Sequence, residues 1–307
     1  MEVSKLKPAC LGRWISIFHS FGIEVRDDGR HSGCPICGPG RNNHRFRVSN
    51  INGDGSWICT QCGSGDGITL IQRTLGLTFP ETIQRISEVV GGCKMDTSQN
   101  NQLDKTKTRE MLNKIWKESA PLSGSDPVSK YLHSRTLVLQ PDNVRYCPEC
   151  YESDTKSHFP AMVAMVMNPN GKPVALHRTY LARDNPQKAD IESPKKLTPR
   201  LEPLSGCAIR LFPPKDNKII VCEGIETGIA CRQIFNEGVY ACISNTIMEG
   251  FIPPEGIRKI IICSDADANF VGQLSAYKLA NRLYNEDFLV DVRMPEILGT
   301  DWNNTIL

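Results

Sequence analysis

Two Cys-x-x-Cys motifs near the amino terminus constrain the fold of this 307-residue chain more than any other feature. Cys34 and Cys37 form the first motif, Cys59 and Cys62 form the second, and 21 residues lie between them. Two thiolates separated by two residues can reach one ion, and structural zinc prefers four such ligands in a tetrahedron. The spacing therefore predicts a four-cysteine Zn²⁺ site, with an intervening hairpin that brings the second motif to the first.

The other cysteines are expected to have different roles. The total of 13 is odd, and without an evident export signal this argues against a framework of disulfides. A third motif, Cys147 and Cys150, has no partner pair, so it either forms a second metal site with His133 or His158 or consists of core thiols. Five further cysteines mostly lie in apolar stretches and are interpreted as core residues: Cys207, Cys222, Cys231, Cys242 and Cys263.

Basic and aromatic residues alternate between the first two motifs. Arg45 and Arg47 flank Phe46, and Trp57 follows shortly before the second motif. Arginine beside an exposed aromatic ring is typical of single-strand binding, through phosphate pairing and base stacking. The two aromatic residues are also suited to form the small core of a ribbon, and we favour that role for them. For Arg45 and Arg47 we favour contact with nucleic acid.

Changes in composition divide the chain into four predicted segments. Residues 1–93 form a zinc-ribbon DNA-binding domain, 94–135 a linker with helices, 136–218 a basic region, and 219–307 an alternation of strands and helices. In the linker we predict helices over 108–119 and 126–134, and in the basic region a hairpin over 161–181. The last segment has predicted strands at 218–222, 239–244, 257–264 and 288–292, with helices at 224–235 and 274–284. The fold class is thus α/β, with a small β ribbon joined by a helical linker to a sheet covered by helices.

Acidic residues follow two of these predicted strands. Glu223 comes directly after the strand that ends at 222, and Asp265 and Asp267 follow the strand that ends at 264. Ligands of α/β sheets bind beyond the carboxyl ends of the strands, so the three carboxylates are expected to converge. Hard oxygen ligands of this kind suit Mg²⁺ in phosphoryl transfer. Asp301 is our candidate for a further acid, and Asp291, inside a strand pattern, is the alternative.

The chain combines a ribbon with a strand that ends in Glu-Gly and a later strand that ends in Asp-x-Asp. In this combination it resembles the zinc-ribbon plus Toprim DNA primases of satellite phages and plasmids, within the DnaG-like Toprim superfamily. The likeness covers about residues 27–90 and 140–307. Its motifs are Arg45-Phe46-Arg47, His177-Arg178-Thr179-Tyr180-Leu181, Ser193-Pro194-Lys195-Lys196 and Cys222-Glu223-Gly224-Ile225-Glu226-Thr227. The resemblance implies a Toprim-type core with a mixed sheet flanked by helices.

The same resemblance implies an activity. It implies a nucleotidyltransferase that joins ribonucleoside triphosphates into primers on single-stranded DNA. Catalytic Glu223, Asp265 and Asp267, with Asp301, would hold Mg²⁺ or Mn²⁺. The resemblance also implies that Arg178, Lys195 and Lys196 contact nucleotides or nucleic acid.

The distribution of charge agrees with this interpretation. The whole chain is nearly neutral, with 36 basic and 34 acidic residues, which excludes a histone-like protein. Residues 171–218 carry a net charge of +5 and residues 219–307 a net charge of −6. A basic segment beside an acidic one is expected for a template groove next to a metal site.

Two alternative functions of the chain remain open. The acids could direct water at a phosphodiester, as in a Toprim nuclease, or the chain could be a non-catalytic single-strand-binding adaptor for a helicase. The sequence lacks the Gly-x-x-x-x-Gly-Lys-Ser/Thr loop of a P-loop motor, so we expect a separate replicative helicase as partner.

No apolar stretch approaches the roughly 20 residues of a membrane helix. We therefore expect no membrane association and a location in the cytoplasm of a bacterial cell or phage-infected host.

Overall fold

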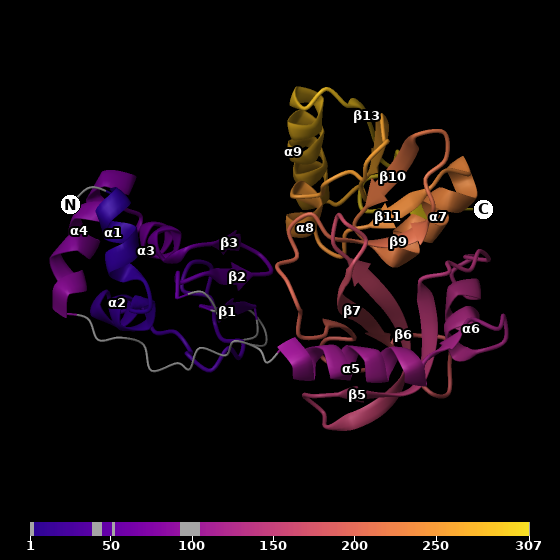
Figure 1. Ribbon diagram of the computed structural model, residues 1–307, viewed down its shortest axis with the longest axis horizontal. Coiled ribbons are helices and arrows are strands. Elements are labelled where there is room, and N and C mark those ends of the chain that lie inside the picture. Colours follow the sequence, from indigo (N-terminus) through magenta and orange to yellow (C-terminus); the bar gives the residue numbers. More distant parts are fainter. Residues whose placement is uncertain (1–2, 39–44, 51–52, 93–104, 307) are drawn as a thin grey trace. The chain divides into compact units, whose positions relative to one another are not determined.

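The computed structural model describes residues 3–38, 45–50, 53–92 and 105–306 of the chain (Figure 1). It consists of two compact units, Met1–Asp104 and Lys105–Leu307. The predicted linker residues 94–104 lie outside the described residues. None of the described helices combines the length and the apolar character needed to cross a bilayer.

The first unit joins a small antiparallel sheet to a group of helices. The sheet has the order β1-β2-β3, with β1 (Phe46–Val48), β2 (Trp57–Cys59) and β3 (Gly63–Gly65). The helices are α1 (Val3–Cys10), α2 (Trp14–Ser20), α3 (Gly67–Leu75) and α4 (Phe79–Val89), followed by the short η1 (Val90–Gly92). Phe46 and Trp57 are buried with their ring centroids 5.8 Å apart, which confirms that they form the core of the ribbon.

Local sequence explains how the ribbon connects to helix α3. The Asp66 side chain accepts a hydrogen bond from the Thr69 N–H, and the Thr69 hydroxyl accepts one from the Asp66 N–H, so a capping box starts the helix. Gly67 lies against the ring of Trp14, and a Cβ at this position would overlap that ring. Only glycine therefore permits helix α3 to pack this closely on helix α2.

The second unit is built on one mixed ten-stranded sheet. Its main path has the order β13-β12-β10-β11-β9-β6-β5-β4, and β7 pairs with β6 and β8. The strands are β4 (Ala120–Pro121), β5 (Val144–Glu152), β6 (Ser157–Met167), β7 (Pro173–Tyr180), β8 (Lys195–Leu197), β9 (Ala208–Phe212), β10 (Lys218–Cys222), β11 (Val239–Ala241), β12 (Lys259–Cys263) and β13 (Leu289–Arg293). Strands β11, β10, β12 and β13 are mutually parallel, whereas the remaining pairs are antiparallel. The predicted mixed sheet flanked by helices is thus confirmed.

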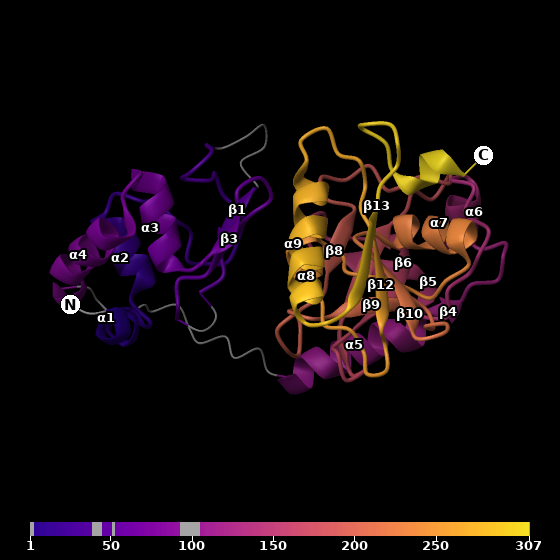
Figure 2. The same ribbon diagram turned by 90° about the horizontal axis from the view of Figure 1, so that it is seen from above.

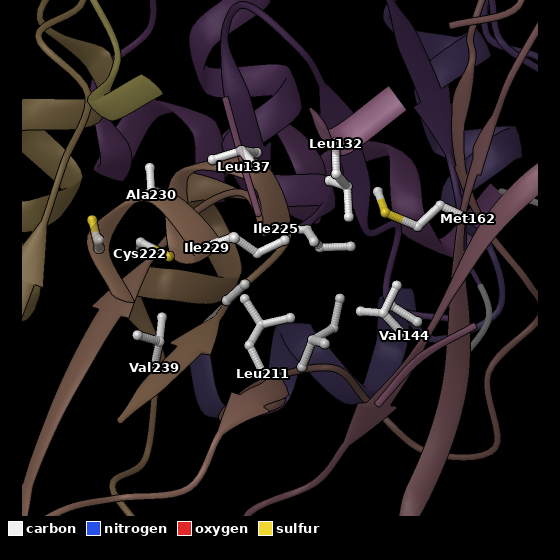
Figure 3. Packing of buried hydrophobic residues seen from close by; sticks show 14 of the residues in the cluster. Leu132, Leu137, Val144, Met162, Leu211, Cys222, Ile225, Ile229, Ala230 and Val239 are labelled. Carbon is white, nitrogen blue, oxygen red and sulfur yellow. The ribbon is translucent and has the colours of Figure 1, made fainter. Parts of the chain in front are cut away.

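Helices cover both faces of the parallel strands (Figure 2). Alternate residues of β10 point to opposite faces, as the period of a strand requires. Ile220 packs with α7 (Ile225–Phe235), and Ile219 packs on the side of α8 (Asn245–Glu249) and α9 (Val271–Asn285). The core on the α7 side continues without a break to Val144 and Met162 of the antiparallel strands (Figure 3). The basic region and the acidic carboxyl-terminal segment therefore share one core.

The expected helices of the linker exist, but they belong to this second unit. Helix α5 (Lys105–Glu118) buries Leu112 against Val163 and Tyr180, and β4 extends the sheet beside β5. Helix α6 (Pro127–His133) contributes Val128 and Leu132 to the main core. Residues 105–135 are thus part of the core rather than a linker, because each helix carries an apolar face that the sheet covers.

Candidate metal centre and acidic site

Four cysteine side chains converge in the first unit. The Sγ atoms of Cys34 and Cys62 lie 3.8 Å apart, as do those of Cys37 and Cys59. All four Sγ atoms lie within 4.8 Å of one another, and within the described ranges this is the only such group of three or more metal-ligating side chains. The structure therefore brings together the four predicted ligands in the arrangement of a four-cysteine metal site.

Backbone groups tune the sulfur atoms of this site. The N–H of Ile36 points at Cys34 Sγ (3.4 Å), and the N–H of Gln61 points at Cys59 Sγ (3.5 Å). Burial raises the pKa of Cys34 and Cys62, whereas at Cys59 backbone N–H groups and the neighbouring thiols together outweigh burial and lower the pKa. Such N–H···S contacts favour the thiolate form, which is the form that ligates metal.

The arginines around the ribbon have different surroundings. The Arg45 guanidinium donates a hydrogen bond to the Gln61 side chain, and Arg47 is the exposed residue of β1. Arg73, which the sequence did not single out, donates to the Cys62 carbonyl (2.9 Å) and lies over the Trp57 ring (5.5 Å). No local pattern distinguishes Arg73 from any other basic residue in the last turn of a helix.

The third cysteine motif has a structural setting. Cys147 and Cys150 are both buried in β5, where a bulge interrupts the pairing with β6. Neither His133 nor His158 joins them in a group of metal-ligating atoms among the residues that the structure describes. The His158 ring instead packs against Tyr151, with centroids 5.3 Å apart.

Four carboxylates gather at the carboxyl ends of β10 and β12. Because these strands are parallel and in register, Cys222 lies opposite Cys263, so Glu223 leaves the sheet level with Ser264 and Asp265 follows one residue later. Burial and the charges of Asp265 and Asp267 raise the pKa of Glu223 to about 7. Burial and the charges of Asp301 and Asp267 raise the pKa of Asp265 to about 6. The structure thus brings Asp301 to this acidic site, whereas Asp291 pairs with Arg293 on β13 (2.8 Å).

Hydrogen bonds orient the acidic side chains. The Thr227 hydroxyl lies 3.3 Å from Asp265 Oδ1, and the Gly272 N–H donates to Asp267 Oδ2 (3.1 Å). Asp301 caps the short helix η2 (Trp302–Thr305) and also lies 3.4 Å from Arg135 Nη2. These contacts orient the carboxylates and offset only part of the repulsion between their negative charges.

The chemistry of these donors suits a hard divalent cation, although no three of the described carboxylates bring their oxygens within 4.8 Å of one another. All candidate ligands are carboxylate oxygens, which Mg²⁺ and Mn²⁺ prefer. Asn245, at the start of α8, lowers the pKa of Glu223 and so lies near it, and its buried Oδ1 has no hydrogen-bond partner among the described residues. A bound cation would also relieve the repulsion that raises the pKa of Glu223 and Asp265.

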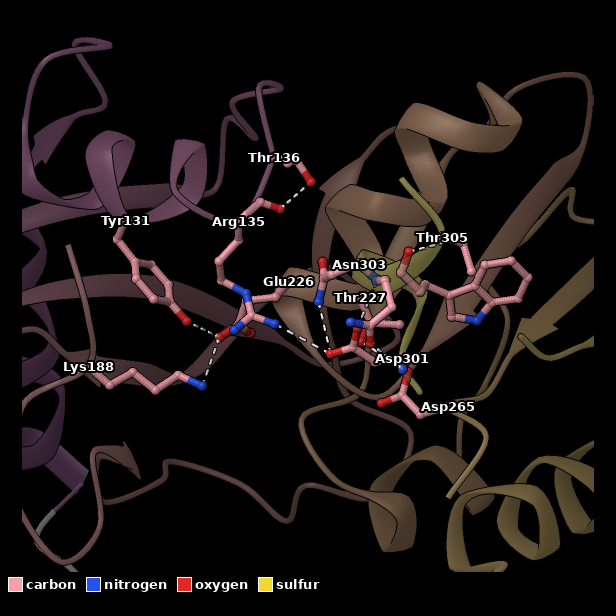
Figure 4. A network of polar contacts seen from close by, with 12 residues as sticks. Tyr131, Arg135, Thr136, Lys188, Glu226, Thr227, Asp265, Asp301, Asn303 and Thr305 are labelled. Carbon is pink, nitrogen blue, oxygen red and sulfur yellow. Dashed lines mark hydrogen bonds and ion pairs between the residues drawn. The ribbon is translucent and has the colours of Figure 1, made fainter. Parts of the chain in front are cut away.

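A buried acid that the sequence analysis did not assign to a role organises the cations beside this site (Figure 4). Glu226 accepts a hydrogen bond from the Tyr131 hydroxyl (2.9 Å) and ion pairs from Lys195 (3.1 Å) and Lys188 (3.5 Å). Although burial opposes it, the two lysines lower the pKa of Glu226 to about 2. In the sequence Glu226 is an ordinary acid in the first turn of a helix, where acids are common for dipole reasons alone.

Of the three basic residues predicted in the second unit, one lies at the acidic site. The charge of Lys195 lowers the pKa of both Glu223 and Asp265. Lys196 instead pairs with Glu152 and with Asp154 (2.6 Å). Arg178 donates to the carbonyls of Tyr151 (3.2 Å) and Leu197 (3.3 Å) and lies over the ring of Tyr180. The last two side chains are thus engaged by protein groups around β5 and β8.

A cleft of about 300 Å³ opens beside the cationic cluster. Its lining comprises Tyr131, Ser134, Arg135, Pro186, Gln187 and Lys188. Two of the lining residues form ion pairs with acids outside the cleft, Lys188 with Glu226 and Arg135 with Asp301. The cleft thus places positive charge next to the acidic site, an arrangement that suits a phosphate-bearing ligand.

Comparison with known sequence families gives three matches. Residues 29–68 match the zinc-binding domain of primase-helicase, residues 218–307 match the Toprim domain, and residues 106–211 match a domain of unknown function. No helicase domain is among these three. The first match contains all four cysteines, and the second contains the four carboxylates of the acidic site.

Solved structures of primases are similar over much of the chain. The zinc-binding and RNA polymerase domains of Aquifex aeolicus primase match with 15% identity and a TM-score of 0.46, covering 100% of this chain and 82% of that one. The RNA polymerase domain of Mycobacterium tuberculosis primase DnaG matches with 14% identity and a TM-score of 0.41, covering 65% and 77%. A bacteriophage T7 assembly of lagging-strand polymerase and primase domains matches with 16% identity and a TM-score of 0.34, covering 61% and 83%.

The four cysteines form the metal site of the matched zinc-binding domain, and the carboxylates lie at the strand ends of the matched Toprim domain. The chain thus contains a segment similar to the zinc-binding domain of primase-helicase and a second segment similar to the Toprim domain.

Proposed function

We propose that this protein is a DNA primase that synthesises short RNA primers on single-stranded DNA by metal-dependent nucleotidyl transfer. The observation that carries the proposal is the convergence of Glu223, Asp265, Asp267 and Asp301 beside Lys195, in a chain that also has a primase-type zinc ribbon. Substrate and template are then ribonucleoside triphosphates and single-stranded DNA.

The residues of the acidic site have distinct parts in this proposal. Glu223, Asp265 and Asp267, with Asp301, hold Mg²⁺ or Mn²⁺, which when bound supplies charge stabilisation during phosphoryl transfer. Lys195 places a fixed positive charge beside the carboxylates, where negative charge develops on the transferred phosphate. Lys188 and Arg135 present further cationic groups in the adjoining cleft and bind the phosphates of the nucleotide.

The first unit contributes template binding. Cys34, Cys37, Cys59 and Cys62 hold a structural Zn²⁺, which fixes the β1–β2 hairpin. Arg45 and Arg47 lie on that ribbon and contact the phosphates of the single strand. We further propose that a separate replicative helicase opens the duplex, and that the protein acts in the cytoplasm of a bacterial cell or phage-infected host.

Synthesis without a primer tests this proposal directly. The purified chain is incubated with single-stranded DNA, labelled ribonucleoside triphosphates and Mg²⁺ or Mn²⁺, and the products are resolved on a denaturing gel. Template-dependent oligoribonucleotides are expected. Cleavage of the DNA without synthesis would establish a Toprim nuclease instead, and binding without either reaction would establish an adaptor.

A further inference from the structure

Exposed apolar side chains occur in two segments that adjoin the turn that carries Asp265 and Asp267. Phe270 and Val271 follow this turn directly, and Ile297 and Leu298 lie in the loop after β13. These four side chains, here called the apolar rim, are 44–69% exposed. Single exposed apolar residues need no explanation, but a group beside a polar site indicates a surface that binds something.

Hydrogen bonds attach both parts of the apolar rim to the acidic turn. Ala266, between the two aspartates, donates its N–H to the Thr300 carbonyl (3.0 Å) and accepts from the Gly299 N–H (2.5 Å). The Asp267 carbonyl accepts from the Phe270 N–H (3.1 Å). The rim therefore keeps a fixed position relative to the carboxylates.

The backbone conformation of Phe270 is uncommon for an aromatic residue. Phe270 has φ of 60° and ψ of 14°, which is the left-handed region. A bulky residue rarely adopts this conformation, and it persists only where neighbouring contacts impose it. Glycine would adopt it without strain, so the turn itself does not call for an aromatic residue. The Phe270 side chain is nevertheless 59% exposed, three residues after Asp267.

We propose that the apolar rim stacks a nucleobase whose phosphate lies at the acidic site. The proposal rests on the proposed function. A nucleotide joins a charged phosphate to a flat apolar base, and here a site for cation and phosphate adjoins an uncharged aromatic surface. Aromatic side chains stack any base, because each base has a π-face. The base is that of the incoming nucleotide, whose phosphates are proposed to lie at the acidic site and in the cationic cleft beside it.

Calorimetric titration of Phe270→Ala with two ligands separates the base from its phosphates. In Mg²⁺, the Kd for ATP is expected to rise about 5- to 100-fold, the range that loss of one stacked base produces. The Kd for inorganic tripolyphosphate is expected to stay unchanged. Tyr284→Ala is the matched control, because Tyr284 is also an exposed aromatic residue of α9 (72%) but lies at the other end of the helix. It should alter neither Kd.

Further arms identify the source of the base and guard against misfolding. Phe270→Tyr keeps the ring and should bind like the wild type. Fluorescence anisotropy with a labelled DNA oligonucleotide is run alongside. A loss of affinity for ATP with unchanged affinity for the oligonucleotide is expected, whereas a loss confined to the oligonucleotide would assign the rim to the strand and overturn the inference.

Three further results would overturn the inference. Wild-type affinity of Phe270→Ala for both ATP and the oligonucleotide means that the rim stacks no base. An equal loss of affinity for tripolyphosphate means that Phe270 only supports the fold of the acidic turn. A lower molar mass of Phe270→Ala in light scattering, with nucleotide binding unchanged, assigns the rim to a second copy of the chain. If the wild type binds neither nucleotide nor single strand, the proposed function itself fails.

Discussion

Cys222 at the end of β10 lies directly opposite Cys263 at the end of β12, because the two neighbouring strands run parallel and in register. Glu223 follows the first cysteine, and Asp265 follows the second by one intervening residue. This register brings the carboxylates together at one edge of the sheet and crowds their charges.

The acidic site predicts stabilisation by divalent cations that grows with pH. A carboxyl group has an ordinary pKa near 4, and the folded state raises the pKa of Glu223 to about 7 and that of Asp265 to about 6. These groups therefore favour the folded state most at low pH, and that contribution is lost as the pH rises through 6 to 7. Bound Mn²⁺ compensates the charges that then appear. At a concentration of 100 times its Kd, Mn²⁺ should raise the free energy of unfolding by about 2.7 kcal/mol at pH 8.

Differential scanning calorimetry with and without Mn²⁺ measures this effect. The cation-dependent rise in Tm should be clearly smaller at pH 5 than at pH 8, and Asp265→Asn should abolish most of it. Asp291→Asn is the matched control, because Asp291 pairs with Arg293 away from the acidic site. An equal effect of Mn²⁺ on both variants would show that the cation binds elsewhere.

The four cysteines predict one Zn²⁺ per chain. Cys62→Ser removes one of the four converging sulfurs, so the zinc content should fall well below one and the first unit should lose its packing. The second unit, which has its own core, should stay folded. Zinc analysis combined with fluorescence of Trp14 and Trp57 gives both readouts. Cys207→Ser, a buried cysteine of the second unit, is the control and should retain full zinc. Retention of stoichiometric zinc by Cys62→Ser would exclude the four-cysteine site.

Glu226 predicts a large effect of a small substitution. Glu226→Gln removes the negative charge that Lys195 and Lys188 share and leaves two lysines facing each other. We expect a loss of about 1–3 kcal/mol in the free energy of unfolding, below the full cost of a broken buried pair because the lysines retain solvent contact. Urea unfolding measures it. Glu149→Gln breaks an ion pair with Arg183 in which both side chains are more than half exposed, and it should change stability by less than about 1 kcal/mol. Similar effects of the two substitutions would contradict this role for Glu226.

Gly67 predicts a steric defect confined to the first unit. Gly67→Ala places a Cβ against the Trp14 ring, so helix α3 must shift, at a cost of about 1–3 kcal/mol. Gly91→Ala has nothing within 4 Å of the added Cβ and should be nearly neutral. Thermal unfolding followed by tryptophan fluorescence compares the two variants. Equal stability would mean that the helices accommodate the methyl group without strain.

Patterns within short segments predicted the fold and part of the acidic site. The parallel strands are short, strongly apolar runs, and Glu223, Asp265 and Asp267 were predictable because the ends of parallel strands meet at one edge. The helical linker was not predicted correctly, because the apolar face of α5, with Met111, Leu112 and Trp116, shows its partner only once the sheet is assembled.

Contacts between distant segments could not be predicted in the same way. Tyr131 and Glu226 are 95 residues apart, and nothing in either local sequence indicates their hydrogen bond. Lys195 and Lys196 are adjacent and chemically identical. Only the alternation of side chains along β8 sends Lys195 towards Glu226 and Lys196 towards Glu152.

The clustered carboxylates at the ends of β10 and β12 are proposed to catalyse primer synthesis. The rate of primer synthesis by Asp265→Asn tests this role most directly. Oligoribonucleotides made on single-stranded DNA in Mg²⁺ are measured for this variant, for the wild type and for Asp291→Asn. We expect Asp265→Asn to be slower by at least about 100-fold, because it loses a charged ligand where transition-state charge is stabilised. Asp291→Asn should keep most of the wild-type rate. Synthesis by Asp265→Asn at the wild-type rate would show that these carboxylates do not catalyse the reaction.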